Sequence, residues 1–409
     1  MSYVAIIAEF NPFTNGHEYI IHEAKKKTGL DVICLMSGNF VQRGEMACID
    51  KYTRATHAIN AGASMVFEMP LTHSASSADD FGKGAVKCLG ELNNVSHLAF
   101  GVETNNTDFL MKLARFKACE PESFKNNLKS FIKNGDSYAV ASFKAYNLEF
   151  KDSSNELEEI FNSPNNILAL TYLSAIYTLK LDIIPVFIQR QDNGYNSNNK
   201  KIVDIDNKKV CFASASHIRN LILNQEIEKT KELVPEFVYN DLISLSDKSL
   251  KKKMAMSETL FMSKLREKTA TDLNLYFDYN EGLAHLIHKA SISNGDYKSL
   301  INASVSKAYR ESRIKKLVAY PYFNLTKTIV KKTKETPSVL NLLATKEEKK
   351  KAVSEIKKSA TAKIIISKKD FDSLTNEEKE ILFLNQKGTD LYNLASSLPA
   401  SMDKTIFIK

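Results

Sequence analysis

Long hydrophobic runs are missing from this sequence. No apolar stretch approaches the roughly 20 residues that cross a membrane, and the start lacks the basic region and long apolar core of a signal peptide. The five cysteines lie far apart and are odd in number, which argues against a disulfide framework and against a Cys-type zinc site. We therefore expect a protein of the reducing cytoplasm, without a membrane span.

Several nucleotide- and metal-binding motifs are also absent. The sequence has neither GxxxxGK(S/T) nor GxGxxG after its first expected strand, so it supports neither a P-loop nor a dinucleotide-binding fold. It has no HExxH, and no Cys/His cluster suggests a metal. His285 and His288 share one face of an expected helix, but the Leu and Ile between them favour packing. We expect no protein-bound metal.

Length and charge suggest two functional halves. The 409 residues, 43% hydrophobic and 25% charged, exceed what one core usually serves. Residues 1–250 carry 26 Lys and Arg against 30 Asp and Glu, a balance of −4, and residues 251–409 carry 30 against 18, a balance of +12. A basic second half indicates a polyanionic partner. The alternative is a set of Lys-rich, solvated helix faces.

Short apolar segments alternate with amphipathic ones over the first hundred residues. This pattern predicts strands at Val4–Ala8, Val32–Met36, Met65–Glu68 and His97–Phe100 and helices at His17–Lys27, Asp50–Ala61 and Ser77–Leu92. Such an alternation is typical of an α/β fold whose parallel sheet is covered on both faces. Ligands of these sheets bind beyond the carboxyl ends of the strands.

The rest of the chain is expected to be mainly helical. A further strand is predicted at Ile183–Gln189, followed by a polar, turn-rich loop at residues 191–200 and a short strand at Ile364–Ile366. We expect one domain at residues 1–222, with the parallel sheet, and a mostly helical, basic domain at residues 223–409.

The most informative segment is the turn after the first expected strand. Thr14-Asn-Gly-His17 follows an apolar run and opens a helix. Gly16 allows the backbone to approach a phosphate, and the first amides of the helix point at negative charge. His17 could donate a hydrogen bond to a phosphoryl oxygen on which charge develops. The pattern has the (H/T)xGH form with which nucleotidyltransferases bind ATP phosphates.

Two further segments carry polar side chains suited to the same edge. The loop Ser37–Glu45 contains Gly38, Gln42 and Arg43, and could hold a carboxylate or a nucleobase; Lys51 and Arg54 begin the next helix. The segment Ser214–Arg219 begins another helix, where Ser214, Ser216 and Arg219 could bind phosphate oxygens. A surface loop and a plain helix cap are the alternatives.

A basic stretch in the second half indicates RNA binding. Its cations lie on one helix-like segment next to Tyr320-Pro-Tyr322: Lys307, Arg310, Arg313, Lys315 and Lys316. Lys and Arg would contact phosphates, and a Tyr could stack on an unpaired base. A solvated helix is again the alternative.

Taken together, these segments resemble the bacterial tRNA(Met) cytidine acetate ligase family, a branch of the HIGH-type nucleotidyltransferases. The resembling segments run in order over about residues 1–220: Ile7–His17, Ser37–Glu45, Asp50-Lys51 with Arg54, Gly62-Ala63, Glu68–Pro70, Ser77-Ala78 with Phe81, Phe100–Glu103, Pro164–Leu168, Arg190 and Ser214–Arg219. Residues after about 220 resemble the family mainly in length and basic character. The resemblance implies a Rossmann-like parallel sheet.

The resemblance also implies an activity. Family members use ATP, with Mg²⁺, to convert acetate into acetyl-adenylate, and transfer the acetyl group to N4 of the wobble cytidine of elongator tRNA(Met). Catalysis is expected from Thr14, His17 and Arg219, and substrate contacts from Ser37, Gly38, Gln42, Arg43 and Lys51. With the two helix-start serines added, the expected ATP site comprises Ile7, Ala8, Glu9, Phe10, Asn11, Pro12, Phe13, Thr14, Asn15, Gly16, His17, Glu18, Tyr19, Ile20, Gly101, Asn165, Asn166, Arg190, Gln191, Ser214 and Ser216.

The chain departs from the family pattern at a few positions. Thr14 and Ile20 stand where members often have His, and Asn196-Ser197 replaces a His-Asp-like pair. Two other functions therefore stay open at this point: a small-molecule adenylyltransferase of the same superfamily, and a non-catalytic RNA-binding protein.

Overall fold

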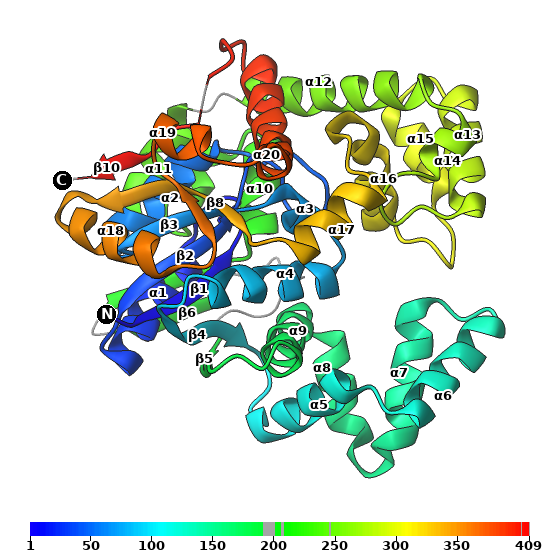
Figure 1. Ribbon diagram of the computed structural model, residues 1–409, viewed down its shortest axis with the longest axis horizontal. Helices are drawn as coiled ribbons and strands as arrows, with labels where there is room; N and C mark the ends of the chain where they lie inside the picture. Colours follow the sequence, from blue (N-terminus) through cyan, green and yellow to red (C-terminus); the bar gives the residue numbers. More distant parts are fainter. Residues whose placement is uncertain (191–200, 206–207, 245–246, 402, 409) are drawn as a thin grey trace.

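A single mixed sheet forms the centre of the molecule (Figure 1). The computed structural model describes residues 1–190, 201–205, 208–244, 247–401 and 403–408. The sheet runs in the order β10-β8-β3-β2-β1-β4-β5, with β9 beside β8. Its strands are β1 (Tyr3–Ala8), β2 (Asp31–Ser37), β3 (Met65–Met69), β4 (Val95–Val102), β5 (Ile184–Gln189), β8 (Val339–Lys346), β9 (Lys363–Ile365) and β10 (Ile406–Ile408).

The first five strands are parallel, and successive residues alternate between two helical layers. Tyr3 and Ala5 of β1 pack on one side, and Val4 and Ile6 pack on the other. A strand buried on both faces has to be apolar at every position, which explains the unbroken hydrophobic run of β1. One layer contains α4 (Ala78–Gly90), α9 (Pro164–Thr178) and α18 (Lys350–Ser359), and the other α1 (Asn15–Thr28), α2 (Lys51–Asn60), α10 (Ala215–Leu223) and α11 (Glu236–Ser244).

A helical lobe is inserted between β4 and α9 and extends away from the sheet (Figure 1, cyan to green). It consists of α5 (Thr107–Cys119), α6 (Glu122–Lys133), α7 (Tyr138–Glu149), the 3₁₀ turn η1 (Lys151–Ser153) and α8 (Ser154–Asn162). Edge-to-face aromatic pairs hold it together, such as Phe116 with Phe124 at 5.6 Å and with Phe150 at 5.0 Å.

The second half is mostly helical, as expected, and forms its own core beside the sheet. Its remaining helices are α12 (Asp247–Arg266), α13 (Ala270–Leu273), α14 (Glu281–Ser293), α15 (Tyr297–Ser304), α16 (Glu311–Phe323), α17 (Lys327–Glu335), α19 (Lys368–Asp372) and α20 (Asn376–Ala395). The remaining elements are short. They are α3 (Leu71–Ser74), η2 (Ile227–Thr230), η3 (Glu347–Lys349) and a hairpin of β6 (Lys201–Ile205) and β7 (Lys208–Phe212).

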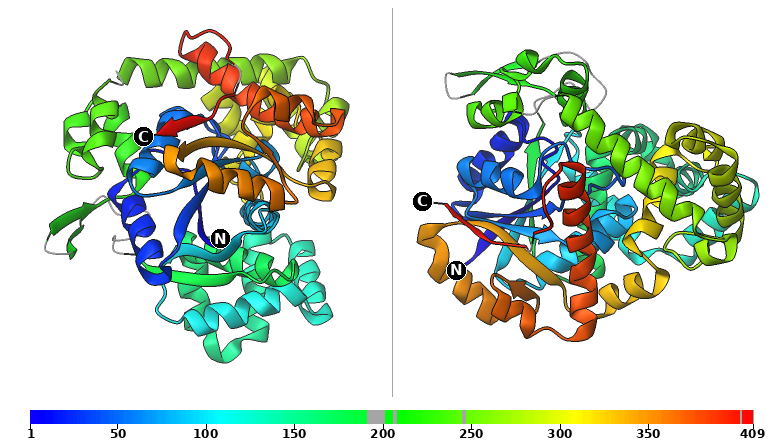
Figure 2. Two further views of the ribbon diagram at one scale, coloured as in Figure 1. Left: turned by 60° about the vertical axis from the view of Figure 1, so that its left-hand side comes forward. Right: turned by 90° about the horizontal axis from the view of Figure 1, so that it is seen from above.

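The two halves share one sheet, which the sequence pattern did not predict. β8 runs antiparallel to β3, and β10 runs parallel to β8. Figure 2 shows β10 (red) lying along β8 (orange). Both strands belong to the second half of the chain and extend the sheet that the first half begins. Phe40 of the first half also packs into the helical core of the second, 4.8 Å from the ring of Phe323. The boundary at residue 222 thus divides a continuous body.

The predicted elements of the first half are confirmed. All four early strands and all three early helices form, with ends shifted by up to two residues. β5 and β9 confirm the later strands, whereas the predicted loop at 191–200 lies outside the described residues. In the part of the chain that the structure describes, no helix is long and apolar enough to span a bilayer.

In the order β3-β2-β1-β4-β5, β2 and β3 are added on one side of β1, and β4 and β5 on the other. The direction in which strands are added therefore reverses next to β1. In sheets of this kind, the crevice outside the carboxyl ends of the strands flanking the switch point binds the ligand. The described residues at the carboxyl ends of β1, β4 and β5 meet there.

Candidate functional site

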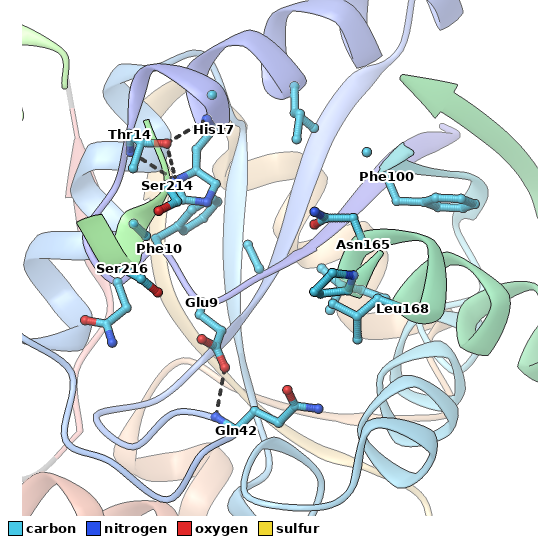
Figure 3. Close-up of a pocket in the computed structure, with 18 of the residues that line it drawn as sticks. Glu9, Phe10, Thr14, His17, Gln42, Phe100, Asn165, Leu168, Ser214 and Ser216 are labelled. Atoms are coloured by element: carbon cyan, nitrogen blue, oxygen red, sulfur yellow. Dashed lines mark hydrogen bonds between the residues drawn. The ribbon is translucent and has the colours of Figure 1, made fainter. Parts of the chain in front are cut away.

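A cavity of about 540 Å³ opens at this switch point. It is lined by the end of β1, the first turns of α1 and α10, the ends of β4 and β5, α4, α9 and the start of α16. That volume lies within the range of small-molecule sites. Figure 3 shows 18 of its lining residues.

The turn between β1 and α1 forms a reciprocal cap. Thr14 is the N-cap of α1, and its hydroxyl accepts a hydrogen bond from the His17 N–H at 3.4 Å. In return, the Thr14 N–H donates to Nδ1 of His17 at 3.0 Å (Figure 3). Because Nδ1 accepts this hydrogen bond, the single ring proton of the neutral imidazole lies on Nε2. His17 is thereby prepared as a hydrogen-bond donor at the cavity wall.

Aromatic packing fixes this turn. Phe10 has a φ of +49°, a backbone conformation that a bulky residue holds only where its surroundings enforce it. Its ring lies 4.9 Å from that of Phe13 and 5.0 Å from that of His17. Phe13 itself is fully buried. The side chain of Asn15 donates to the carbonyls of Cys211 and Glu232, both at 2.9 Å, and so anchors the turn to β7 and to the segment between η2 and α11.

The first turn of α10 forms the facing wall. Ser214 caps this helix by accepting from the His217 N–H at 3.1 Å. The guanidinium of Arg219 donates to the carbonyl of Asn11 at 2.6 Å and to the hydroxyl of Ser216 at 3.0 Å. Two helix N-termini and an arginine therefore surround one cavity, an arrangement that attracts anions.

The carboxyl ends of β4 and β5 and the first turn of α9 form a third wall. Arg190 donates to Oδ1 of Asn165 at 2.9 Å, and Asn165 donates to the carboxylate of Glu103 at 2.5 Å. A side chain at Gly101 would come within 3.1 Å of Cγ of Arg190, so glycine is what allows this close approach. Asn166 turns inward instead, where its Oδ1 accepts from the N–H groups of Glu103 and Thr104.

The floor of the cavity consists of Glu9, Gln42 and Arg43. Oε1 of Glu9 accepts a hydrogen bond of 2.8 Å from the Gln42 N–H (Figure 3). Burial raises the pKa of Glu9, against the smaller opposing effects of this N–H and of Arg219, Arg54 and Arg43. Beneath the floor, the fully buried Arg54 donates to the carbonyls of Glu9, Ser37 and Gly38 and holds the two loops together.

The structure does not place Lys51 in the cavity. Its ammonium is fully buried 2.9 Å from the carboxylate of Glu68 and 2.7 Å from that of Asp403, and Asn341 donates to both acids. Burial lowers the pKa of Lys51 and the two carboxylates raise it, with a net rise. Lys51 thus joins α2 to β3, β8 and the segment before β10.

The expected ATP-site and substrate residues divide into two groups. Lining the cavity are Ile7, Ala8, Glu9, Phe10, Asn11, Thr14, Gly16, His17, Tyr19, Ile20, Gln42, Arg43, Gly101, Asn165, Arg190, Ser214, Ser216 and Arg219. Supporting it from behind or lying elsewhere are Pro12, Phe13, Asn15, Glu18, Ser37, Gly38, Lys51 and Asn166. Gln191 lies outside the described residues.

The predicted basic stretch is also divided. Arg310 and Lys316 reach the cavity mouth, and Lys307 is exposed away from it. Arg313 forms two hydrogen bonds of 2.8 Å with the carboxylate of Asp278, and Lys315 pairs with Glu45 and Glu311. Burial lowers the pKa of Lys316 to about 8.

Part of the cavity wall is apolar, and its residues form no recognisable motif in the sequence. Phe81 and Ala78 from α4, Phe100 from β4, and Leu168 and Tyr172 from α9 line one side. The sequence pointed to Phe81 and Phe100 only through the resemblance to the family. Nothing in the sequence pointed to Tyr172, because an aromatic residue on a buried helix is expected to pack in the core. Glu45 and Ser312 were likewise not assigned to the cavity.

The chain is similar to known proteins over nearly its whole length. A family model described as HIGH Nucleotidyl Transferase matches residues 1–405. A protein named tRNA(Met) cytidine acetate ligase from Thermoanaerobacter sp. (strain X514) is 34% identical over 400 residues, covering 97% of this chain and 96% of the relative. A protein of the same name from Clostridium perfringens is 33% identical over 402 residues, covering 96% and 95%. The crystal structure of Thermotoga maritima TmcAL bound with alpha-thio ATP has the same fold, with a TM-score of 0.88, 24% identity and complete coverage of both chains.

Proposed function

Because this chain belongs to the tRNA(Met) cytidine acetate ligase family of HIGH nucleotidyltransferases, we propose that it is an ATP-dependent acetate ligase that modifies tRNA. In the first step, an acetate oxygen attacks the α-phosphorus of ATP, giving acetyl-adenylate and pyrophosphate. In the second, N4 of the wobble cytidine of elongator tRNA(Met) attacks the acetyl carbonyl, giving N4-acetylcytidine and AMP.

The observation that carries this proposal is the cap at Thr14 and His17. It turns the first amides of α1 and Nε2 of His17 toward a cavity that the N-terminus of α10 and Arg219 close from the other side. Donors fixed in this way can stabilise the charge that builds up on the α-phosphate without reorganising. Arg190, at the end of β5, adds a further cation to the wall.

We propose that Mg²⁺ accompanies ATP. Among the described residues, no group of three or more His, Cys, Asp or Glu side chains is placed to hold a metal ion. The triphosphate oxygens and water suit Mg²⁺ as ligands, so the protein need not supply a carboxylate cage. The ion would neutralise phosphate charge.

We propose that residues 1–222 bind ATP and that residues 223–409 bind the tRNA. Arg310 lies at the cavity mouth and Lys307 lies near it in sequence, both exposed, and neither takes part in an ion pair with another described residue. Arg310 at the cavity mouth would contact the phosphates around the wobble base, and Lys307 would contact phosphates farther along the RNA. Arg313 and Lys315 support the helix from which Lys316 extends.

One assay tests the proposal directly. The purified protein is incubated with ATP, Mg²⁺, labelled acetate and total tRNA, and the RNA is digested to nucleosides. We expect labelled N4-acetylcytidine that requires both ATP and tRNA. If acetate-dependent exchange between ATP and pyrophosphate is absent while a phosphorylated metabolite supports it, the chain is a small-molecule adenylyltransferase.

A further inference from the structure

Glu9 occupies the centre of the cavity floor. It follows the last residue of β1 and lies between the side formed by His17 and Ser214 and the side formed by Asn165 and Leu168 (Figure 3). The left-handed backbone at Phe10 immediately after it turns the chain toward α1. The carboxylate therefore lies between the phosphate-binding end and the apolar wall.

Among the described residues, one oxygen of this carboxylate accepts a hydrogen bond and the other accepts none. Oε1 accepts the hydrogen bond from the Gln42 N–H, and no described residue donates to Oε2. The charged groups that act on it are Arg219 from α10, Arg54 from α2 and Arg43 from the loop after β2. Two of these are held by other partners, since Arg219 donates to Asn11 and Ser216, and Arg54 donates to main-chain carbonyls. Oε2 keeps a lone pair available inside the cavity.

The two chemical steps of the proposed function differ in their need for a base. Acetate reaches ATP already ionised, so its attack on phosphorus releases no proton. The second step forms the N4–C bond and breaks the bond between the acetyl carbon and the phosphate oxygen, and AMP leaves with that electron pair. The nitrogen then has one proton too many, and a group in the cavity has to accept it.

Resting on the proposed function, we propose that Oε2 of Glu9 is the general base that accepts this proton from N4 of the cytidine. The apolar wall opposite provides aromatic side chains against which a nucleobase can pack, with Phe81, Phe100 and Tyr172 in it. A base approaching from Arg310 at the mouth would bring its amino group over Glu9.

The other titratable groups of the described cavity wall are less suited. Glu45 is paired with Lys315 at 2.9 Å. Nδ1 of His17 is engaged by Thr14, and its Nε2 already carries a proton. Lys316 donates to the carbonyl of Ser76 at 2.9 Å. Burial also raises the pKa of Glu9 above its usual value, which makes its carboxylate a better proton acceptor near neutral pH.

The test separates the two steps with Glu9→Gln, whose amide oxygen can still accept from the Gln42 N–H. Any loss of acetate-dependent exchange between ATP and pyrophosphate should be far smaller than the loss of transfer. Transfer from chemically prepared acetyl-adenylate to tRNA, followed in a single turnover, should fall roughly 10²–10⁴-fold. The matched control is Glu355→Gln, an exposed residue on α18, for which both rates should equal those of wild type.

A pH profile adds a readout that a merely structural role would not change. Because the pKa of Glu9 is raised, its carboxylate becomes protonated as the pH falls, and the wild-type transfer rate should decrease on the acid side of the profile. The residual transfer rate of Glu9→Gln should not show this decrease. Equal transfer rates for Glu9→Gln and wild type would overturn the assignment. So would a parallel loss of exchange and transfer, which would place Glu9 in ATP binding or in the support of Gln42. If wild type itself shows no acetate-dependent exchange, the proposed function fails, and the role of Glu9 fails with it.

Discussion

Arg219 of α10 donates a hydrogen bond of 2.6 Å to the main-chain carbonyl of Asn11, 208 residues earlier in the sequence. With its second contact to Ser216, this guanidinium joins the loop after β1 to the helix that faces it. The two N-termini that line the cavity are thereby held in a fixed relation. Positioned donors of this kind are the means by which phosphoryl chemistry proceeds without a covalent enzyme intermediate.

His17→Ala should reduce adenylate formation roughly 10²–10³-fold, as expected when a donor to developing phosphate charge is removed. The measurement is acetate-dependent exchange between ATP and pyrophosphate. His22→Ala, on the exposed face of the same helix, serves as the control and should retain the wild-type rate. An unchanged rate in His17→Ala would remove this ring from the mechanism.

Gly101→Ala should weaken ATP binding about 10-fold while the protein stays folded. The new methyl group would lie 3.1 Å from Cγ of Arg190 and push that side chain away from Asn165. Calorimetric titration with ATP checks the affinity. Gly295→Ala introduces a methyl group into open space and should bind ATP like wild type. Unaltered affinity in Gly101→Ala would mean that Arg190 does not contact the nucleotide.

Lys51→Met should lower the free energy of unfolding by about 3–5 kcal/mol, because it leaves the carboxylates of Glu68 and Asp403 buried without their cation. Denaturant titration gives this quantity. The control is Lys349→Met, which removes a partly exposed ion pair with Asp31 and should cost about 1 kcal/mol or less. Equal losses in the two variants would show that the buried cluster contributes no more than a surface pair.

Lys307→Glu combined with Arg310→Glu should weaken tRNA binding and reduce the steepness with which affinity falls as salt rises, because fewer phosphates are neutralised. Filter binding over a series of salt concentrations measures both effects, and exchange without RNA reports whether the cavity is intact. Arg313 is left unchanged because its reversal would also break the pair with Asp278. An unaltered salt slope would show that the segment leading into α16 carries only solvated cations.

The cavity could be foreseen from sequence wherever a residue's role follows from its neighbours. Thr14, Gly16 and His17 stand between an apolar strand and an amphipathic helix, and Ser214 to Arg219 open another helix, so capping rules alone place their donors at a sheet edge. Lys51 shows where such reasoning stops. It stands at a helix start like Ser216, but its partners Glu68 and Asp403, and Asn341 that donates to both of them, come from other parts of the chain.

The sequence by itself determined the parallel strands, their flanking helices and the capped turn at Thr14–His17, because hydrophobic period and helix caps act over a few residues. Only the tertiary structure decided that β8 and β10 extend the same sheet, that Arg313 and Lys315 are paired internally, and that Glu9 stands with one free carboxylate oxygen on the cavity floor among the described residues. Contacts between residues tens to hundreds of positions apart depend on how whole layers pack, and no local pattern encodes that packing.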